Sequence, residues 1–127
     1  MSRFICALIV VLLYATAFAA EDTAIVKRVA NATVLIRTNL LHGFAEDRKA
    51  TGRWMGSGFL VDKEKGWIVT NRHVAGIGPA ELRIQVVDSK KKIPAERIYV
   101  DSKHDLALLK VDPNELPDNS QVLSLAC

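Results

Sequence analysis

Short apolar runs separated by polar turns follow one another along most of the chain after residue 30. Each run is rich in Val, Ile and Leu and is bounded by turn-forming or charged residues, which is typical of β-strands. The pattern predicts strands at residues 31–40, 58–63, 66–71, 81–88, 93–101 and 105–112. Most connections are too short for crossover helices, so the strands should pair antiparallel. We therefore predict an all-β fold, either an antiparallel six-stranded barrel or a sandwich.

Two segments depart from the strand pattern. Residues 21–30, "EDTAIVKRVA", fit a short helix that leads into the first strand. Residues 41–55, "LHGFAEDRKATGRWM", form a longer polar connection, which we expect to be a surface loop.

The first twenty residues have the layout of a secretory signal peptide. Arg3 is followed by an apolar run from Phe4 to about Leu13, and small residues end at Ala19. Such a short apolar run favours cleavage after Ala19 over retention as an uncleaved membrane anchor. We expect a signal peptide at 1–19 and one domain at 20–127, exported to a periplasmic or extracellular compartment.

Cleavage would leave 108 of the 127 residues, enough for one small core. It would also remove Cys6, so Cys127 would be the one remaining cysteine and no internal disulfide could form. The net charge would fall from +3 to about +2 with the loss of Arg3. The basic cluster at 90–92 is expected to be a solvated hairpin tip, not a nucleic-acid site. A membrane partner is expected only if the signal is retained.

Two motifs resemble one protease family. The segments "GSGFLVDKEKGWIVTNRHV" and "HDLALLKVD" are similar, in this order, to the first half of the chymotrypsin-fold serine proteases of the HtrA (DegP-like) type. The similarity spans residues 56–113. It implies that the strands form the N-terminal barrel of a trypsin-like double-barrel fold, with the second barrel missing.

The resemblance implies that His73 is a general base and Asp105 its orienting acid. A serine hydroxyl is too weak an acid to attack an amide unaided, so a neutral imidazole must take its proton while a carboxylate holds the other ring N–H. Taken singly, His73 would be interpreted as a turn histidine and Asp105 as a solvent-facing carboxylate. His104, if it shares a strand with Asp105, should point to the opposite face and not serve as the base.

No serine fits the role of nucleophile. Ser57 is flanked by glycines, but it precedes His73, whereas this fold orders its triad His, Asp, Ser. Ser120 and Ser124 follow Asp105 without flanking glycines that could build an oxyanion hole. Ser89 and Ser102 offer no such context either.

We assign no function to two weaker patterns. Asn31-Ala32-Thr33 matches a glycosylation sequon but lies at a predicted strand start. No metal site is expected, because the candidate ligands have no ligand spacing: His42, His73, His104 and Cys127. No cofactor is expected.

We therefore predict a truncated secreted serine endopeptidase that carries base and acid but no nucleophile, and that is inactive alone. Its expected partners are unfolded or misfolded protein substrates, the missing C-terminal barrel and further copies of the same chain in a homo-oligomer. The alternative is a non-catalytic β-barrel binding module derived from a protease. An apolar face and the tail "VLSLAC" are expected to be left open to water.

Overall fold

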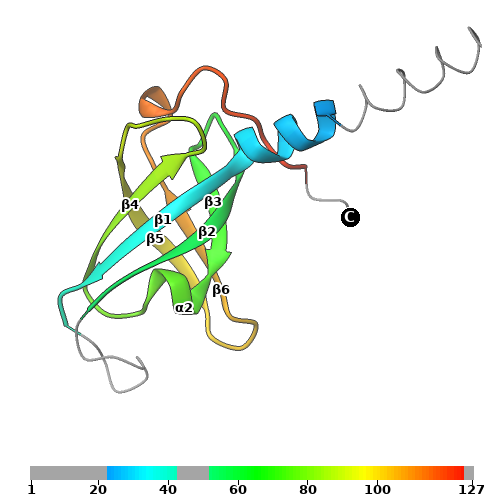
Figure 1. Cartoon of the computed structure of the whole chain (residues 1–127). Coiled ribbons are helices and arrows are strands. Elements are labelled where there is room, and N and C mark those ends of the chain that lie inside the picture. The colour runs from blue at the N-terminus through cyan, green and yellow to red at the C-terminus, as the bar shows by residue number, and fades with distance from the viewer. Residues whose placement is uncertain (1–22, 43–51, 125–127) are drawn as a thin grey trace, which may run out of the picture.

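A computed structural model describes residues 23–42 and 52–124. Six antiparallel strands close into a barrel in the order β1-β2-β3-β6-β5-β4 (Figure 1). Their bounds are β1 Thr33–Leu40, β2 Gly52–Asp62, β3 Trp67–Asn71, β4 Ala80–Val86, β5 Ile93–Asp101 and β6 Leu106–Lys110. The predicted all-β class and six-stranded antiparallel barrel are confirmed, and the sandwich is wrong.

Three predicted boundaries need correction. The first strand starts at Thr33, because residues 23–32 are helical, including the sequon residue Asn31. β2 begins at Gly52, so the end of the predicted 41–55 loop is strand. There Leu40 pairs with Gly52, and this long hairpin pairing overrides the polar composition. The last strand begins at Leu106, which places Asp105 just before it.

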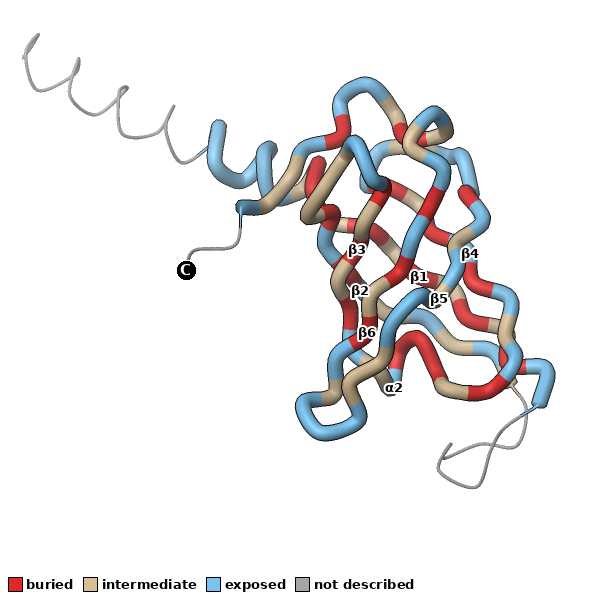
Figure 2. The backbone as a smooth tube through the Cα atoms, turned by 180° about the vertical axis from the view of Figure 1, so that it is seen from behind, coloured by how far each residue is buried: buried red, intermediate tan, exposed pale blue. Residues whose placement is uncertain are grey.

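The barrel interior is filled by the alternate positions of each strand. Burial alternates without interruption along β1 (Figure 2). The branched residues at its alternate positions are fully buried. The fully buried aliphatic core includes Val34, Ile36, Leu60, Ile68, Ile84 and Leu109. Each such side chain contributes about 1.5–3 kcal/mol through its removal from water. This core makes the strands a rigid support for the loops at the barrel ends.

Different segments cover the two ends of the barrel. The four-residue helix α2, Arg72–Ala75, lies at one end (Figure 1). At the other end lie residues 23–32 and the chain that follows the 3₁₀ helix η1, Pro113–Glu115. In this chain, the N–H of Gln121 donates to the carbonyl of Asn31 (3.1 Å) and that of Leu123 to Leu60 (3.0 Å).

The expectation that the apolar tail, residues 122–127, is open to water is therefore wrong for residues 122 and 123. Val122 packs against the core, and both it and Leu123 are half-buried. The predicted signal peptide and residues 125–127 lie outside the described residues. Within the described ranges, no helix is both long enough and apolar enough to cross a bilayer.

The basic cluster at 90–92 lies in the exposed connection from β4 to β5. Lys91 Nζ donates to the Glu115 carbonyl at 3.2 Å and lies 3.5 Å from the Glu115 carboxylate. The cluster therefore belongs to a hairpin connection, with one of its charges directed at η1.

Candidate active site

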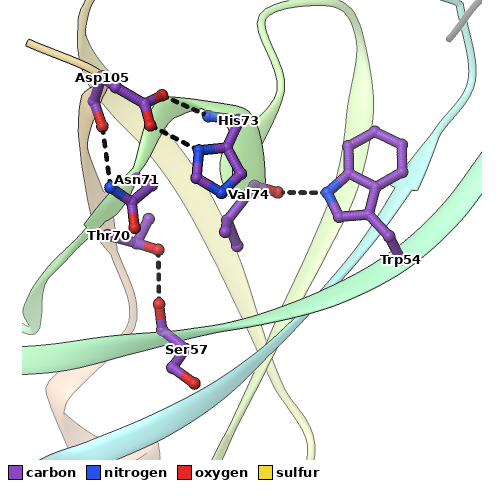
Figure 3. Close-up of polar contacts among 7 residues, drawn as sticks. All are labelled: Trp54, Ser57, Thr70, Asn71, His73, Val74 and Asp105. Atoms are coloured by element: carbon purple, nitrogen blue, oxygen red, sulfur yellow. Dashed lines mark hydrogen bonds and ion pairs between the residues drawn. The ribbon is translucent and has the colours of Figure 1, made fainter. Parts of the chain in front are cut away.

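His73 and Asp105 are brought together by the pairing of two barrel strands. β3 ends at Asn71 and β6 begins at Leu106, and these two residues are partners in the antiparallel register. The chain beyond β3 therefore faces the chain that precedes β6. His73 lies in α2 and Asp105 in the turn before β6, so two residues 32 positions apart meet at one end of the barrel (Figure 3).

Several hydrogen bonds join the two segments. The His73 ring atom Nδ1 lies 2.5 Å from Asp105 Oδ2, and the His73 backbone N–H donates to Asp105 Oδ1 at 3.0 Å. The Asp105 carbonyl accepts from the backbone N–H of Arg72 (2.9 Å) and from Asn71 Nδ2 (3.3 Å). Both carboxylate oxygens thus hold His73, while the carbonyl holds the two residues before it.

The backbone of Asp105 has the left-handed conformation, with φ of 54°. Aspartate tolerates this region better than most residues, because its short side chain forms local hydrogen bonds. The hydrogen bond from the His73 ring, followed by that from the His73 N–H, lowers the pKa of Asp105 below its usual value. Asp105 is therefore an ionised acceptor at neutral pH.

The contact fixes which ring nitrogen of His73 carries the proton. An ionised carboxylate can only accept, so Nδ1 must donate and the neutral imidazole keeps its lone pair on Nε2. Within residues 23–42 and 52–124, no hydrogen bond to Nε2 is formed. The His73 side chain is 64% exposed. This is the state that a general base requires before it accepts a proton.

The helix that carries His73 is seated on β1 and β2. Thr38 Oγ1 (2.7 Å) and Trp54 Nε1 (2.8 Å) both donate to the Val74 carbonyl. Below them, a Cβ on Gly56 would lie 2.5 Å from both Cγ atoms of Val74, so only glycine permits this approach. Sequence reasoning does not identify Thr38 or Trp54, and Trp54 falls within the predicted 41–55 loop. A tryptophan two residues before the "GSG" motif was the available signal.

The serines of the described chain do not complete a triad. Ser57 is exposed on β2, and its hydroxyl points away from the imidazole, while its carbonyl accepts from Thr70 Oγ1 (Figure 3). Ser120 is buried at the far end of the barrel, with its N–H on the Pro117 carbonyl. Ser89 and Ser102 lie in turns, and Ser124 is exposed near the end of the described chain.

His104 forms a separate, local pair. Its Nδ1 lies 2.7 Å from Asp101 Oδ2, and its backbone N–H donates to the other oxygen at 3.1 Å. The predicted placement of His104 and Asp105 on opposite faces of one strand is wrong, because both residues lie in the turn before β6. His104 is instead separated from His73 by its own pairing with Asp101. Within the described residues, no three His, Cys, Asp or Glu side chains gather where they could hold a metal ion.

A hollow of about 360 Å³ lies away from the histidine, on the outer face of β1, β2 and β4. Its lining includes Arg37, Arg53 and Arg83, but neither His73 nor Asp105. The candidate site itself is open to solvent at the barrel end, where the His73 and Asp105 side chains are 64% and 45% exposed.

Comparison with known proteins agrees with this geometry. Residues 56–126 match the family described as "Trypsin-like peptidase domain". The chain is 37% identical over 97 residues to the "Pro-apoptotic serine protease NMA111" of Chaetomium globosum, covering 76% of this chain and 9% of that protein. It is 36% identical over 87 residues to "Protease Do-like 7" of Arabidopsis thaliana, covering 68% of this chain and 8% of that protein.

A third relative is the "PDZ domain-containing protein C23G3.12c" of Schizosaccharomyces pombe, which is 33% identical over 91 residues. That similarity covers 72% of this chain and 9% of the relative. The chain thus spans less than a tenth of the length of these relatives, at 8 to 9%.

Proposed function

The chain belongs to the trypsin-like peptidase domain family, of the HtrA or Do-like type, and from this premise we propose that it supplies the general base and orienting acid of a serine endopeptidase. His73 is the proposed base and Asp105 the acid that orients it. The observation that carries the proposal is the 2.5 Å contact between His73 Nδ1 and Asp105 Oδ2, with Nε2 left available.

The proposed chemistry is peptide-bond hydrolysis in two steps. Nε2 takes the proton of a serine hydroxyl while the serine oxygen bonds to the scissile carbonyl carbon, and the resulting imidazolium then protonates the leaving amine. A water molecule releases the acyl group by the same transfers in reverse. Asp105 stays ionised throughout and stabilises the imidazolium, in keeping with its lowered pKa.

The nucleophile and the oxyanion hole are proposed to lie on a second barrel, outside the described residues. This part of the proposal is supported by the orientation of Ser57, whose hydroxyl points away from the base. Leu106, beside Asp105, is 43% exposed, and Tyr99 on the neighbouring strand is 60% exposed, so apolar surface next to the site is available for such a barrel.

The proposed substrates are unfolded or misfolded proteins, reached after export to a periplasmic or extracellular compartment. The open position of His73 suits an extended polypeptide substrate, because the His73 side chain is 64% exposed. The layout of the first nineteen residues supports the export route.

Complementation with a second barrel tests the proposal. The chain is fused to the second barrel of an HtrA-type protease, and cleavage of casein and of a fluorogenic peptide is measured. We expect the fusion to be active and the chain alone to be inactive. Activity should be lost with His73→Ala, and also when the serine of the added barrel is replaced by alanine.

Two results would count against this function. A folded fusion without activity, combined with saturable binding of unfolded casein by the chain alone, would favour the non-catalytic binding module. Activity of the chain alone that disappears with Ser57→Ala would show that the nucleophile has been misplaced.

A further inference from the structure

The turn that follows the histidine has an unusual set of hydrogen-bond donors. Five consecutive carbonyls, from Val74 to Gly78, all accept from side chains of other strands. Thr38 and Trp54 share the first of them. Arg97 donates to the other four, with Nη1 on Ala75 (2.9 Å) and Gly76 (2.7 Å), and Nη2 on Ile77 (2.9 Å) and Gly78 (2.7 Å).

The position of Arg97 in β5 explains how it reaches the turn. Ile93, Ala95 and Arg97 occupy alternate positions on the inward face of the strand, and all three are at least half-buried. A β-bulge follows at once, because Arg97 pairs with Leu109 while Tyr99 pairs with Leu108. The bulge ends the regular alternation directly after Arg97. The guanidinium group is thereby kept at the barrel end, beneath α2.

The histidine helix depends on such external donors. α2 has only four residues, and its C-terminal end is capped by the N–H of Gly76, which donates to the Arg72 carbonyl at 2.8 Å. A helix this short has no stability of its own, and the carbonyls at its end need partners. A planar guanidinium can hold two pairs of carbonyls at once, which a lysine ammonium cannot do with the same geometry.

We propose that Arg97 is a positioning residue for His73. By fixing four carbonyls of the turn that ends α2, it sets the helix against β6 and so holds the imidazole at its distance from the Asp105 carboxylate. Arg97 does not touch the reacting atoms. This inference rests on the proposed function of His73, but it can be tested without activity.

The test is nuclear magnetic resonance of the full chain labelled with ¹⁵N-histidine. In the unaltered chain we expect a slowly exchanging Nδ1–H resonance from His73, assigned by its loss in Asp105→Asn. In Arg97→Gln this resonance should broaden or vanish, and the Gly76 amide should exchange with solvent at least about tenfold faster. A tenfold change corresponds to about 1.4 kcal/mol. Arg97→Lys should restore part of the protection.

Arg83→Gln is the matched control, since it removes the same charge from the exposed face of β4. It should leave the His73 resonance and the Gly76 amide unchanged. Spectra are recorded at a temperature where circular dichroism shows every variant folded, and if Arg97→Gln does not fold, Arg97→Lys decides. If the folded Arg97 variants melt earlier but keep the Nδ1–H resonance, Arg97 only stabilises the barrel and the proposal is overturned.

The active fusion separates this inference from the proposed function. There, Arg97→Gln should lower kcat by about tenfold with little change in KM, because the base is displaced while substrate contacts remain. An inactive fusion in which Arg97→Gln still abolishes the Nδ1–H resonance would refute the protease function and leave the positioning role intact. An unaltered chain without that resonance would refute the positioning role itself.

Discussion

Gly56 on β2 lies directly against Val74 on α2, with no space for a side chain between them. A Cβ at Gly56 would fall 2.5 Å from both Cγ atoms of Val74, well inside the usual contact distance of about 3.5–4.0 Å. Val74 is also buried, with 7% exposure, so it cannot swing out into water without cost. The residue next to His73 therefore rests on bare strand backbone.

Gly56→Ala should displace α2 and lower both stability and activity. Overpacking of this kind costs about 1–3 kcal/mol, which for a domain of about 100 residues lowers Tm by several degrees. Thermal melts of the chain, together with casein cleavage by the fusion, measure the two effects. Ser57→Ala, on the exposed neighbour, should change neither. An unaltered Tm and rate in Gly56→Ala would show that the helix tolerates a side chain beneath it.

Asp105→Asn should greatly lower the kcat of the fused protease while leaving the protein folded. The amide can donate to Nδ1, which would favour the tautomer protonated on Nε2, and the analogous loss in the trypsin-like template is about 10⁴ in kcat. Initial rates with the fluorogenic peptide measure the effect. His104→Ala should retain full activity, because His104 pairs only with Asp101. Equal losses of activity in Asp105→Asn and His104→Ala would contradict the assignment of the catalytic role to the His73–Asp105 pair alone.

The His73–Asp105 contact should stabilise the fold in a pH-dependent way. The pKa of Asp105 is lowered in the folded chain, first by the His73 ring and then by the His73 N–H. Its contribution is therefore present above the unfolded pKa of about 3.9 and is lost as pH falls through the lower folded value. Asp105→Asn should reduce Tm at about pH 6, and the difference should shrink as pH falls below the unfolded pKa of about 3.9.

The expected effect is small, because the Asp105 side chain is 45% exposed and screened by solvent. Paired thermal melts of the two proteins across this pH range give the measurement. A difference in Tm that stays constant down to the lowest pH would contradict the assignment of the carboxylate as an ionised acceptor.

Export should produce a chain that begins at Ala20. Ala17 and Ala19 occupy the positions that a signal peptidase reads, and the apolar run before them is short. Mass spectrometry of the exported form in a secreting host gives the mature N-terminus. An intact Met1 on membrane-bound protein would instead indicate an uncleaved anchor.

The apolar runs were sufficient to predict an all-β fold of six antiparallel strands, whereas the family resemblance favoured the barrel over the sandwich. The side-chain period of β-strands depends on local geometry, so the six runs gave the strands to within a few residues, except for the early start of β2. That start depends on pairing between Leu40 and Gly52, and a tertiary pairing of this kind leaves little trace in local composition. The same limit applies to Asp105, whose turn conformation removed it from the predicted strand.

Of the candidate site, sequence motifs indicated the two residues that are proposed to carry the chemistry but not those that hold them. His73 and Asp105 lie in recognisable segments, whereas the role of Arg97 depends on a bulge and on four backbone carbonyls. Hydrogen bonds to backbone carbonyls impose no residue type on the accepting side. The only sequence signal was a charged residue in phase with the buried positions of a strand, at Arg97 after Ile93 and Ala95.

The strand order also links the histidine pair to closure of the barrel. β1–β3 and β4–β6 are two successive three-stranded units, and in the described barrel their strands pair with each other where β1 meets β4 and where β3 meets β6. His73 follows the first unit and Asp105 opens the last strand of the second, so the pair spans the seam between β3 and β6. In the folded chain, the two side chains are held together by the pairing of β3 with β6. Thermal opening of the seam should separate them again, so the proposed base should be held in place only in molecules whose barrel is closed.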